Sequence, residues 1–86
     1  MNHILKTEPI MWFAIMDGAK TAEFRKDDRG FSVGDSLLLK PGTDTRDNSP
    51  TIDVKVTHIV RGPSFGIPEG FVMMSFSVNE ISGFRE

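Results

Sequence analysis

The sequence contains no cysteine, and this absence excludes several kinds of chemistry at once. A chain without cysteine forms no disulfide, offers no thiolate nucleophile and builds no cysteine-based zinc site. Histidine is scarce as well: His3 and His58 are the two present, and neither belongs to an HxH or HExxH motif. We therefore predict a protein that uses no metal and no other cofactor.

Long apolar runs are also missing. No segment approaches the roughly 18 consecutive apolar residues that a membrane span requires. The first residues, MNHILKTEP, lack the charged region and apolar stretch of a secretory signal. We therefore expect a cytoplasmic protein that has no membrane partner.

Nucleophilic-serine motifs, phosphate-binding glycine loops and dinucleotide fingerprints are absent too.

What remains is the composition of one small globular domain. The chain has 86 residues, of which 38% are hydrophobic and 26% charged, and its formal net charge is −2. A chain of this length buries its apolar residues in a single core. We expect one domain that spans residues 1–86.

The order of apolar and polar residues predicts one helix near the N-terminus. Pro9 suits the first turn of a helix, Thr7 or Glu8 can cap its free N–H groups, and Asp17-Gly18 ends it in a left-handed glycine turn. The helix between these signals is apolar all round. We expect it to pack on a sheet on one side and to make a further contact on the other.

Alternation of apolar and polar residues predicts the strands. They are residues 3–6, 20–25, 36–40, 52–60 with a bulge near His58, and 71–78, the last of which is apolar on both faces and therefore central. Residues 41–50 form a loop, and residues 64–69 form another that Phe65 and Ile67 anchor.

Antiparallel strands joined by turns, in a chain too short for repeated crossover helices, favour a mainly β (α+β) fold. We predict a small curled sheet or β-barrel of about five strands that the N-terminal helix plugs. A closed barrel would leave no exposed strand edge.

A cluster of charge between residues 20 and 29, with four basic and three acidic side chains, is the main functional signal. Within it, Lys20, Glu23 and Arg25 are candidates for a ligand-binding cleft. A lysine partly desolvated in a cleft acts as a base or as a donor to an oxyanion, whereas contact with Glu23 would suit it to holding an anion. The alternative is a same-face ion pair between Glu23 and Arg25 that only stabilises the strand.

Other basic side chains extend this cluster. Lys26 and Arg29 are candidates for phosphate contacts; the alternative is a solvated turn, in which Asp28 caps the loop and holds Arg29 in place. Because acids alternate with these bases, a nucleic acid would be bound through few phosphates and with modest salt dependence. Lys6 points either into the cleft of Lys20 or to solvent.

Two aromatic residues of the helix, Trp12 and Phe13, offer a base a stacking surface or belong to the core. Of the two, Trp12 is expected to keep an exposed edge, because it is large and its N–H needs a partner. We therefore include Trp12 among the candidate ligand-binding residues.

Four segments of the chain carry a family resemblance. They are residues 3–6 (HILK), 18–25 (GAKTAEFR), 28–35 (DRGFSVGD) and 65–72 (FGIPEGFV). Together they resemble the ASCH-like proteins of the PUA superfamily, and more narrowly the compact bacterial and phage proteins classed as a domain of unknown function. The resemblance implies a PUA-like β-barrel, a cleft lined by Lys20, Glu23 and Arg25 beside the helix, and binding of RNA or nucleotides.

Some ASCH proteins are enzymes. One branch is similar to small amidohydrolases that remove an acyl group from N4-acetylcytidine, and another is linked to RNA cleavage. A lysine of the GxK segment is catalytic in the amidohydrolase branch, and Lys20 is the residue that matches it.

Three functions follow as hypotheses. The first is an RNA- or nucleotide-binding module that recognises unpaired or modified bases in the charged cleft, with a basic rim of Lys6, Lys26 and Arg29. The second is a small hydrolase of an acylated nucleoside or of RNA, in which Lys20 is catalytic. The third is a protein-binding accessory domain, which aliphatic residues at the mouth of the cleft would favour. The sequence leaves the ligand and the oligomeric state open.

Overall fold

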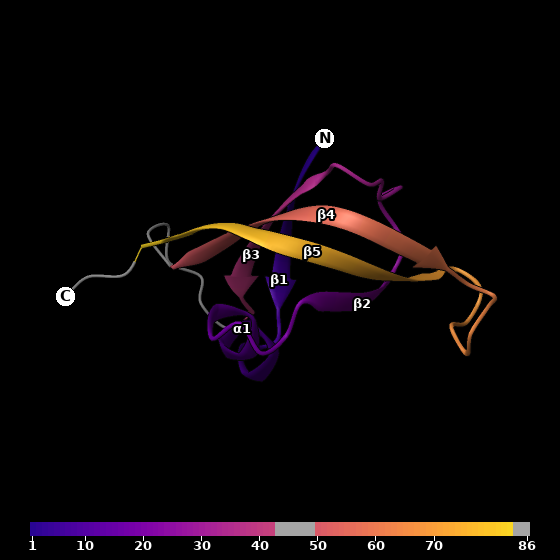
Figure 1. The fold of residues 1–86 in the computed structure, drawn as a ribbon, viewed down its shortest axis with the longest axis horizontal. Coiled ribbons are helices and arrows are strands. Elements are labelled where there is room, and N and C mark those ends of the chain that lie inside the picture. Colours follow the sequence, from indigo (N-terminus) through magenta and orange to yellow (C-terminus); the bar gives the residue numbers. More distant parts are fainter. Residues whose placement is uncertain (43–49, 84–86) are drawn as a thin grey trace.

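A computed structural model describes residues 1–42 and 50–83. It shows a five-stranded sheet that curls into a half-barrel, with one short helix beside it (Figure 1). In chain order the elements are β1 (Asn2–Thr7), α1 (Pro9–Met16), β2 (Ala22–Lys26), β3 (Ser36–Pro41), β4 (Thr51–Arg61) and β5 (Phe71–Ser82). The predicted mainly β fold with five strands and one N-terminal helix is confirmed.

The strand order in the sheet is β1-β3-β4-β5-β2. Four of these strands pair antiparallel as expected, but β1 pairs parallel with β3, with His3 opposite Leu37. The expectation of an entirely antiparallel sheet is therefore wrong. Parallel neighbours need a crossover connection, and the segment that contains α1 and β2 supplies it.

The sheet is open, and two arginine side chains, one on β2 and one in the loop after it, donate to the edge strand β1. Arg25 on β2 donates from Nη2 to the carbonyl oxygen of Lys6 at 3.2 Å, and Arg29 donates from Nη1 to the carbonyl oxygen of Ile4 at 3.0 Å. Both carbonyls belong to β1. Side-chain hydrogen bonds from β2 and its following loop thus connect to β1 where a closed barrel would have a ladder of backbone hydrogen bonds.

Helix α1 begins at Pro9 and ends as predicted, because Gly18 adopts φ +81° after Asp17. Glu8 at the N-cap position makes no capping hydrogen bond with its side chain, and Thr7 Oγ1 has no partner among the described residues, so the expected cap from Thr7 or Glu8 is wrong. Thr7 instead ends β1 with its side chain buried.

One face of α1 packs into the half-barrel and the other is exposed. Trp12 and Ile15 are buried, whereas Ile10 and Phe13 are 75% and 51% exposed. The expected contact on the second side is therefore absent from the part of the chain that the structure describes.

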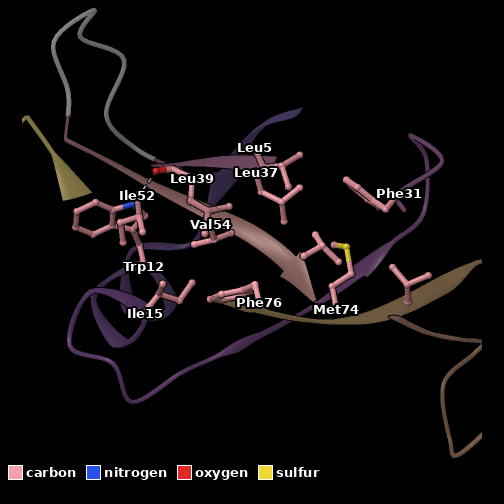
Figure 2. Close-up of a cluster of buried hydrophobic side chains, with 12 residues drawn as sticks. Leu5, Trp12, Ile15, Phe31, Leu37, Leu39, Ile52, Val54, Met74 and Phe76 are labelled. Carbon is pink, nitrogen blue, oxygen red and sulfur yellow. Dashed lines mark hydrogen bonds between the residues drawn. The ribbon is translucent and has the colours of Figure 1, made fainter. Parts of the chain in front are cut away.

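Trp12 is the largest side chain of the core and is 1% exposed, which corrects the expectation of an exposed indole edge. Its indole N–H donates to the carbonyl oxygen of Leu39 at 3.0 Å, so the polar group finds its partner inside the half-barrel (Figure 2). The core consists of Leu5, Trp12, Ile15, Phe31, Leu37, Leu39, Ile52, Val54, Val56, Val72, Met74 and Phe76.

Strands β4 and β5 form a long hairpin that extends beyond the rest of the sheet at its turn end (Figure 1). The pairing register shifts between Val56 and His58, which confirms the predicted bulge, and again between Asp53 and Val54. Strand β5 lies between β4 and β2, so its prediction as an interior strand is confirmed.

The connection at the tip of this hairpin contains a second, tight turn. Ser64 and Ile67 exchange two backbone hydrogen bonds of 3.2 and 2.7 Å, which leaves Phe65 and Gly66 at the turn itself with φ of +49° and +79°. Ile67 is buried as expected, but Phe65 is 94% exposed. The expectation that Phe65 anchors the loop is wrong, because the turn directs this side chain outward.

The predicted loop at residues 41–50 is described only at its ends. Pro41 belongs to β3, and residues 43–49 lie outside the described residues.

Asp35 organises a buried polar network beside β1. Its carboxylate accepts hydrogen bonds from the Ser32 N–H at 2.9 Å and from the Met1 amine at 3.2 Å, and lies 2.9 Å from His3 Nε2. The hydrogen bond to His3, together with those from Ser32 and the Met1 amine, lowers the pKa of Asp35 from 3.8 to about 2, although burial opposes the shift. The negative charge of Asp35 therefore stabilises the fold.

We expect this charge to make the protein acid-sensitive. A lowered pKa contributes stability above pH about 4, which is lost as the pH falls towards about 2. Asp35→Asn should lower the free energy of unfolding at pH 7 by about 1–3 kcal/mol, because it removes hydrogen bonds to a charged group. Urea unfolding from pH 7 to pH 2 measures this difference. It should shrink below pH about 4, and a difference that stayed constant would contradict the assignment.

Candidate functional site

A pocket of about 310 Å³ opens between the end of β1, the start of α1 and strand β2. It lies where the half-barrel is not closed by a backbone ladder. Its lining combines three cations, two acids and two apolar side chains with one threonine: Lys6, Thr7, Glu8, Met11, Lys20, Glu23, Phe24 and Arg25.

Strand β2 turns its polar face towards this pocket. Glu23 is buried and Arg25 is half-buried, whereas Phe24 between them, on the alternate face of the strand, is 51% exposed and still contributes to the lining. The alternation predicted from the sequence is therefore correct. Polar side chains can face inward here because β2 is an edge strand, and its inner face meets the open mouth of the half-barrel.

Lys20, Glu23 and Arg25 form a chain of alternating charge. Lys20 Nζ lies 3.5 Å from Glu23 Oε1, and Arg25 Nη1 lies 3.8 Å from Glu23 Oε2. The side chains are 26%, 8% and 26% exposed in that order. Lys20 also donates to the carbonyl oxygen of Ala22. These contacts present Lys20 as a hydrogen-bond donor beside a carboxylate, which is the arrangement that suits it to holding an anion.

Two buried polar atoms beneath the pocket have no hydrogen-bond partner among the described residues. They are Thr7 Oγ1 and Arg25 Nη1, whose distance to Glu23 exceeds that of a hydrogen bond. A buried unsatisfied polar group costs roughly 1–3 kcal/mol, and native proteins contain few of them. Both atoms belong to residues that line the pocket, so a polar ligand there would meet two unsatisfied groups.

Of the three residues of the predicted basic rim, Lys6 lines the pocket, whereas Lys26 and Arg29 do not. Lys6 is exposed and lines the pocket together with Lys20. Lys26 is exposed at the end of β2, outside the lining. Arg29 is also outside it, because its guanidinium is held by the Ile4 carbonyl and lies 3.8 Å from Asp28.

Asp27, and not Asp28 as predicted, caps the loop that carries Arg29. It accepts hydrogen bonds from the Gly30 and Phe31 N–H groups at 2.9 and 3.1 Å, and from Arg61 Nη1 at 2.7 Å. Burial raises the pKa of Asp27, but these hydrogen bonds outweigh it and leave the pKa lowered. Arg61 was not predicted, because it reaches the loop from β4, 34 residues further along the chain.

Sequence reasoning also missed Thr7, Glu8, Met11 and Phe24 as residues of the site. Thr7 and Glu8 were interpreted as helix caps, and Phe24 as one apolar position of an alternating strand. Thr7 and Glu8 lie where β1 meets α1, whereas Met11 lies within α1 and Phe24 in the middle of β2, so no local pattern connects the four residues.

A second hollow of about 320 Å³ lies over β1, β3 and β4 and is lined by Asn2, His3, Ile4, Ser36, Leu38 and Asp53. Its lining contains no lysine or arginine, and His3 is already bound to Asp35. The pocket beside β2 is therefore the better candidate for an anionic ligand.

Neither a metal centre nor a membrane helix is found in residues 1–42 and 50–83. No three of their histidine, aspartate and glutamate side chains are placed to hold a metal ion together. No helix there has the length and apolarity needed to cross a membrane.

Fold and site together define a small β half-barrel domain with a charged pocket between its two edge strands, β1 and β2. The family model described as "Domain of unknown function (DUF3850)" matches residues 2–76, and the chain belongs to this family. No curated protein matches the sequence.

Proposed function

We propose that the protein binds an unpaired or modified base of RNA, or the corresponding nucleotide, in the pocket between β1, α1 and β2. The observation that carries this proposal is the alternation of Lys20, Glu23 and Arg25 along the pocket. Lys20 and Arg25 are hydrogen-bond donors, and the acceptor Glu23 lies between them. This pattern complements the edge of a nucleobase, which offers acceptors and donors side by side.

The walls of the pocket suit a flat ring. Met11 approaches from α1 and Phe24 from β2, and both are exposed. Apolar and aromatic surfaces of this kind stack on unpaired bases. The resemblance of the sequence to ASCH-like proteins supports the same class of ligand.

The charges at the mouth favour a nucleotide over an apolar protein segment. Five of the lining side chains are charged, namely Lys6, Glu8, Lys20, Glu23 and Arg25. Aliphatic residues would have supported a protein-binding domain. Because acids offset the cations, we expect few phosphate contacts and a gentle salt dependence.

Catalysis by Lys20 has less support than binding. The lysine donates to the Ala22 carbonyl and to Glu23, so both contacts use it as a donor. Turnover of N4-acetylcytidine or RNA that disappears in Lys20→Ala would nevertheless replace the binding proposal with the hydrolase.

We expect Lys20→Ala to lower affinity about tenfold or more, because it removes a charged hydrogen-bond donor. The measurement is a calorimetric or fluorescence titration with short single-stranded RNAs, the four ribonucleoside monophosphates and modified nucleosides. Lys55→Ala on β4 is the matched control, since Lys55 is an exposed lysine outside the pocket. Absence of saturable binding, or equal loss in both variants, would refute the proposal.

Thr7→Val should affect stability and binding in opposite directions. Valine keeps the shape of the side chain and removes a buried hydroxyl that has no partner among the described residues, so we expect about 1 kcal/mol of added stability. The same change should weaken nucleotide binding, because the hydroxyl can no longer turn towards a ligand. Thermal unfolding and titration of one preparation measure both effects. A destabilised variant with full affinity would show that the hydroxyl is structural.

A further inference from the structure

An apolar strip covers the outer face of the sheet directly beside the pocket. Phe24 and Phe71 stack nearly parallel, with ring centroids 5.4 Å apart and an interplanar angle of 14°. Phe24, Met73 and Val60 also lie in one row across β2, β5 and β4, because Met73 is the register partner of the other two. We call Phe24, Phe71, Met73 and Val60 the outer strip.

The outer strip is accessible and continuous with the pocket. Phe24 and Met73 are 51% and 38% exposed, and Phe71 and Val60 are half-buried. Phe24 belongs to both surfaces, since it also lines the pocket. If the terminal base of a nucleic acid occupied the pocket, the next nucleotide would therefore lie beside the aromatic side chains of the outer strip.

The charges around the outer strip suit a polyanion. Its register neighbours on β2, β4 and β5 are Ala22, Ser75, His58 and Lys26, none of which is acidic. Lys26 lies opposite Phe71 with its side chain exposed, and Lys6 lies on the other side of the pocket. A cation beside stacked aromatic rings is the combination found in surfaces that bind single-stranded nucleic acid.

From this arrangement we propose that the ligand is a single-stranded oligonucleotide, one base of which enters the pocket while the next stacks on the outer strip. The proposal rests on the proposed function of the pocket and adds the substrate class. Stacking requires unpaired bases, so a duplex is excluded as the ligand. Lys26, which lies outside the pocket, then contacts the phosphate between the two sites.

The experiment compares three ligands: an equimolar mixture of ribonucleoside monophosphates, a randomised RNA hexamer and the corresponding DNA hexamer. The expected result is that a hexamer binds at least about fivefold more tightly than the monophosphates, because stacking of one base contributes this much or more. The hexamer that binds more tightly shows whether the site prefers ribose or deoxyribose.

Phe71→Ala tests the outer strip, because Phe71 does not line the pocket. We expect it to remove the hexamer advantage and to leave the affinity for monophosphates unchanged. Phe65→Ala is the matched control, since Phe65 is a phenylalanine that is 94% exposed at the hairpin tip. It should bind like the wild type. Thermal unfolding of both variants shows whether the sheet is retained, and Met73→Ser replaces Phe71→Ala if it is not.

The possible failures are distinguishable. Monophosphates that bind as tightly as hexamers would overturn the strip and leave the pocket proposal intact. Binding of neither ligand would overturn both. A dimer in sedimentation that Phe71→Ala abolishes, while hexamer affinity stays unchanged, would assign the strip to a second copy of the chain and overturn the proposal.

Discussion

Replacement of Trp12 by alanine is expected to lower the free energy of unfolding by about 3–5 kcal/mol. The indole lies at 1% exposure in the core and donates to the Leu39 carbonyl, so the variant loses apolar burial and leaves this carbonyl without its donor. The free energy of unfolding of a native protein is roughly 5–15 kcal/mol. A loss of this size would therefore remove a large part of the stability of the fold. Urea unfolding followed by circular dichroism measures the loss.

Phe13→Ala is the control for this substitution. Phe13 follows Trp12 in the same helix but is 51% exposed, so we expect a loss below about 1 kcal/mol. Similar losses in the two variants would mean that helix propensity, and not burial against β3, determines the effect. Trp12→Phe then separates the hydrogen bond from the packing.

Gly62→Ala is expected to cost about 3 kcal/mol or more, because it overpacks backbone against backbone. A Cβ atom at Gly62 would lie 1.8 Å from the carbonyl oxygen of Pro68 and 2.7 Å from that of Ile67. Neither atom can withdraw without opening the base of the loop at the hairpin tip. The melting temperature and amide exchange in residues 61–71 report the damage.

Gly66→Ala serves as the comparison in the same loop. A Cβ there meets nothing within 4 Å, but Gly66 has φ +79°, so only backbone strain of about 1–2 kcal/mol is added. If Gly66→Ala proved the more damaging, the close approach of Gly62 to Pro68 would not be a determinant of the loop.

Much of the fold could be predicted from local sequence patterns. Alternation located the strands, and Pro9 and Gly18 located the ends of α1, because these signals act within a few residues. The parallel pairing of β1 with β3 could not be predicted, since it depends on where the segment with α1 and β2 returns the chain. The exposure of Phe65 depends on a two-residue turn that overrides the usual burial of phenylalanine.

The site was predicted in part for the same reason. Lys20, Glu23 and Arg25 lie within six residues of one another, and the structure brings them together. Thr7 reaches the same pocket from β1, and Arg61 reaches the Asp27 loop from β4, so both depend on tertiary contacts. Trp12 was assigned to the site because its N–H needs a partner, and that partner is the Leu39 carbonyl inside the core.

The two arginines that donate to β1 have a consequence for self-association. The free edge of a sheet exposes backbone groups that another chain can pair with, which promotes aggregation. On β1 the carbonyls of Ile4 and Lys6 are already occupied by Arg29 and Arg25. A strand from a neighbouring molecule would have to displace two charged side chains before adding to this edge. The open half-barrel therefore protects its N-terminal strand without closing the sheet.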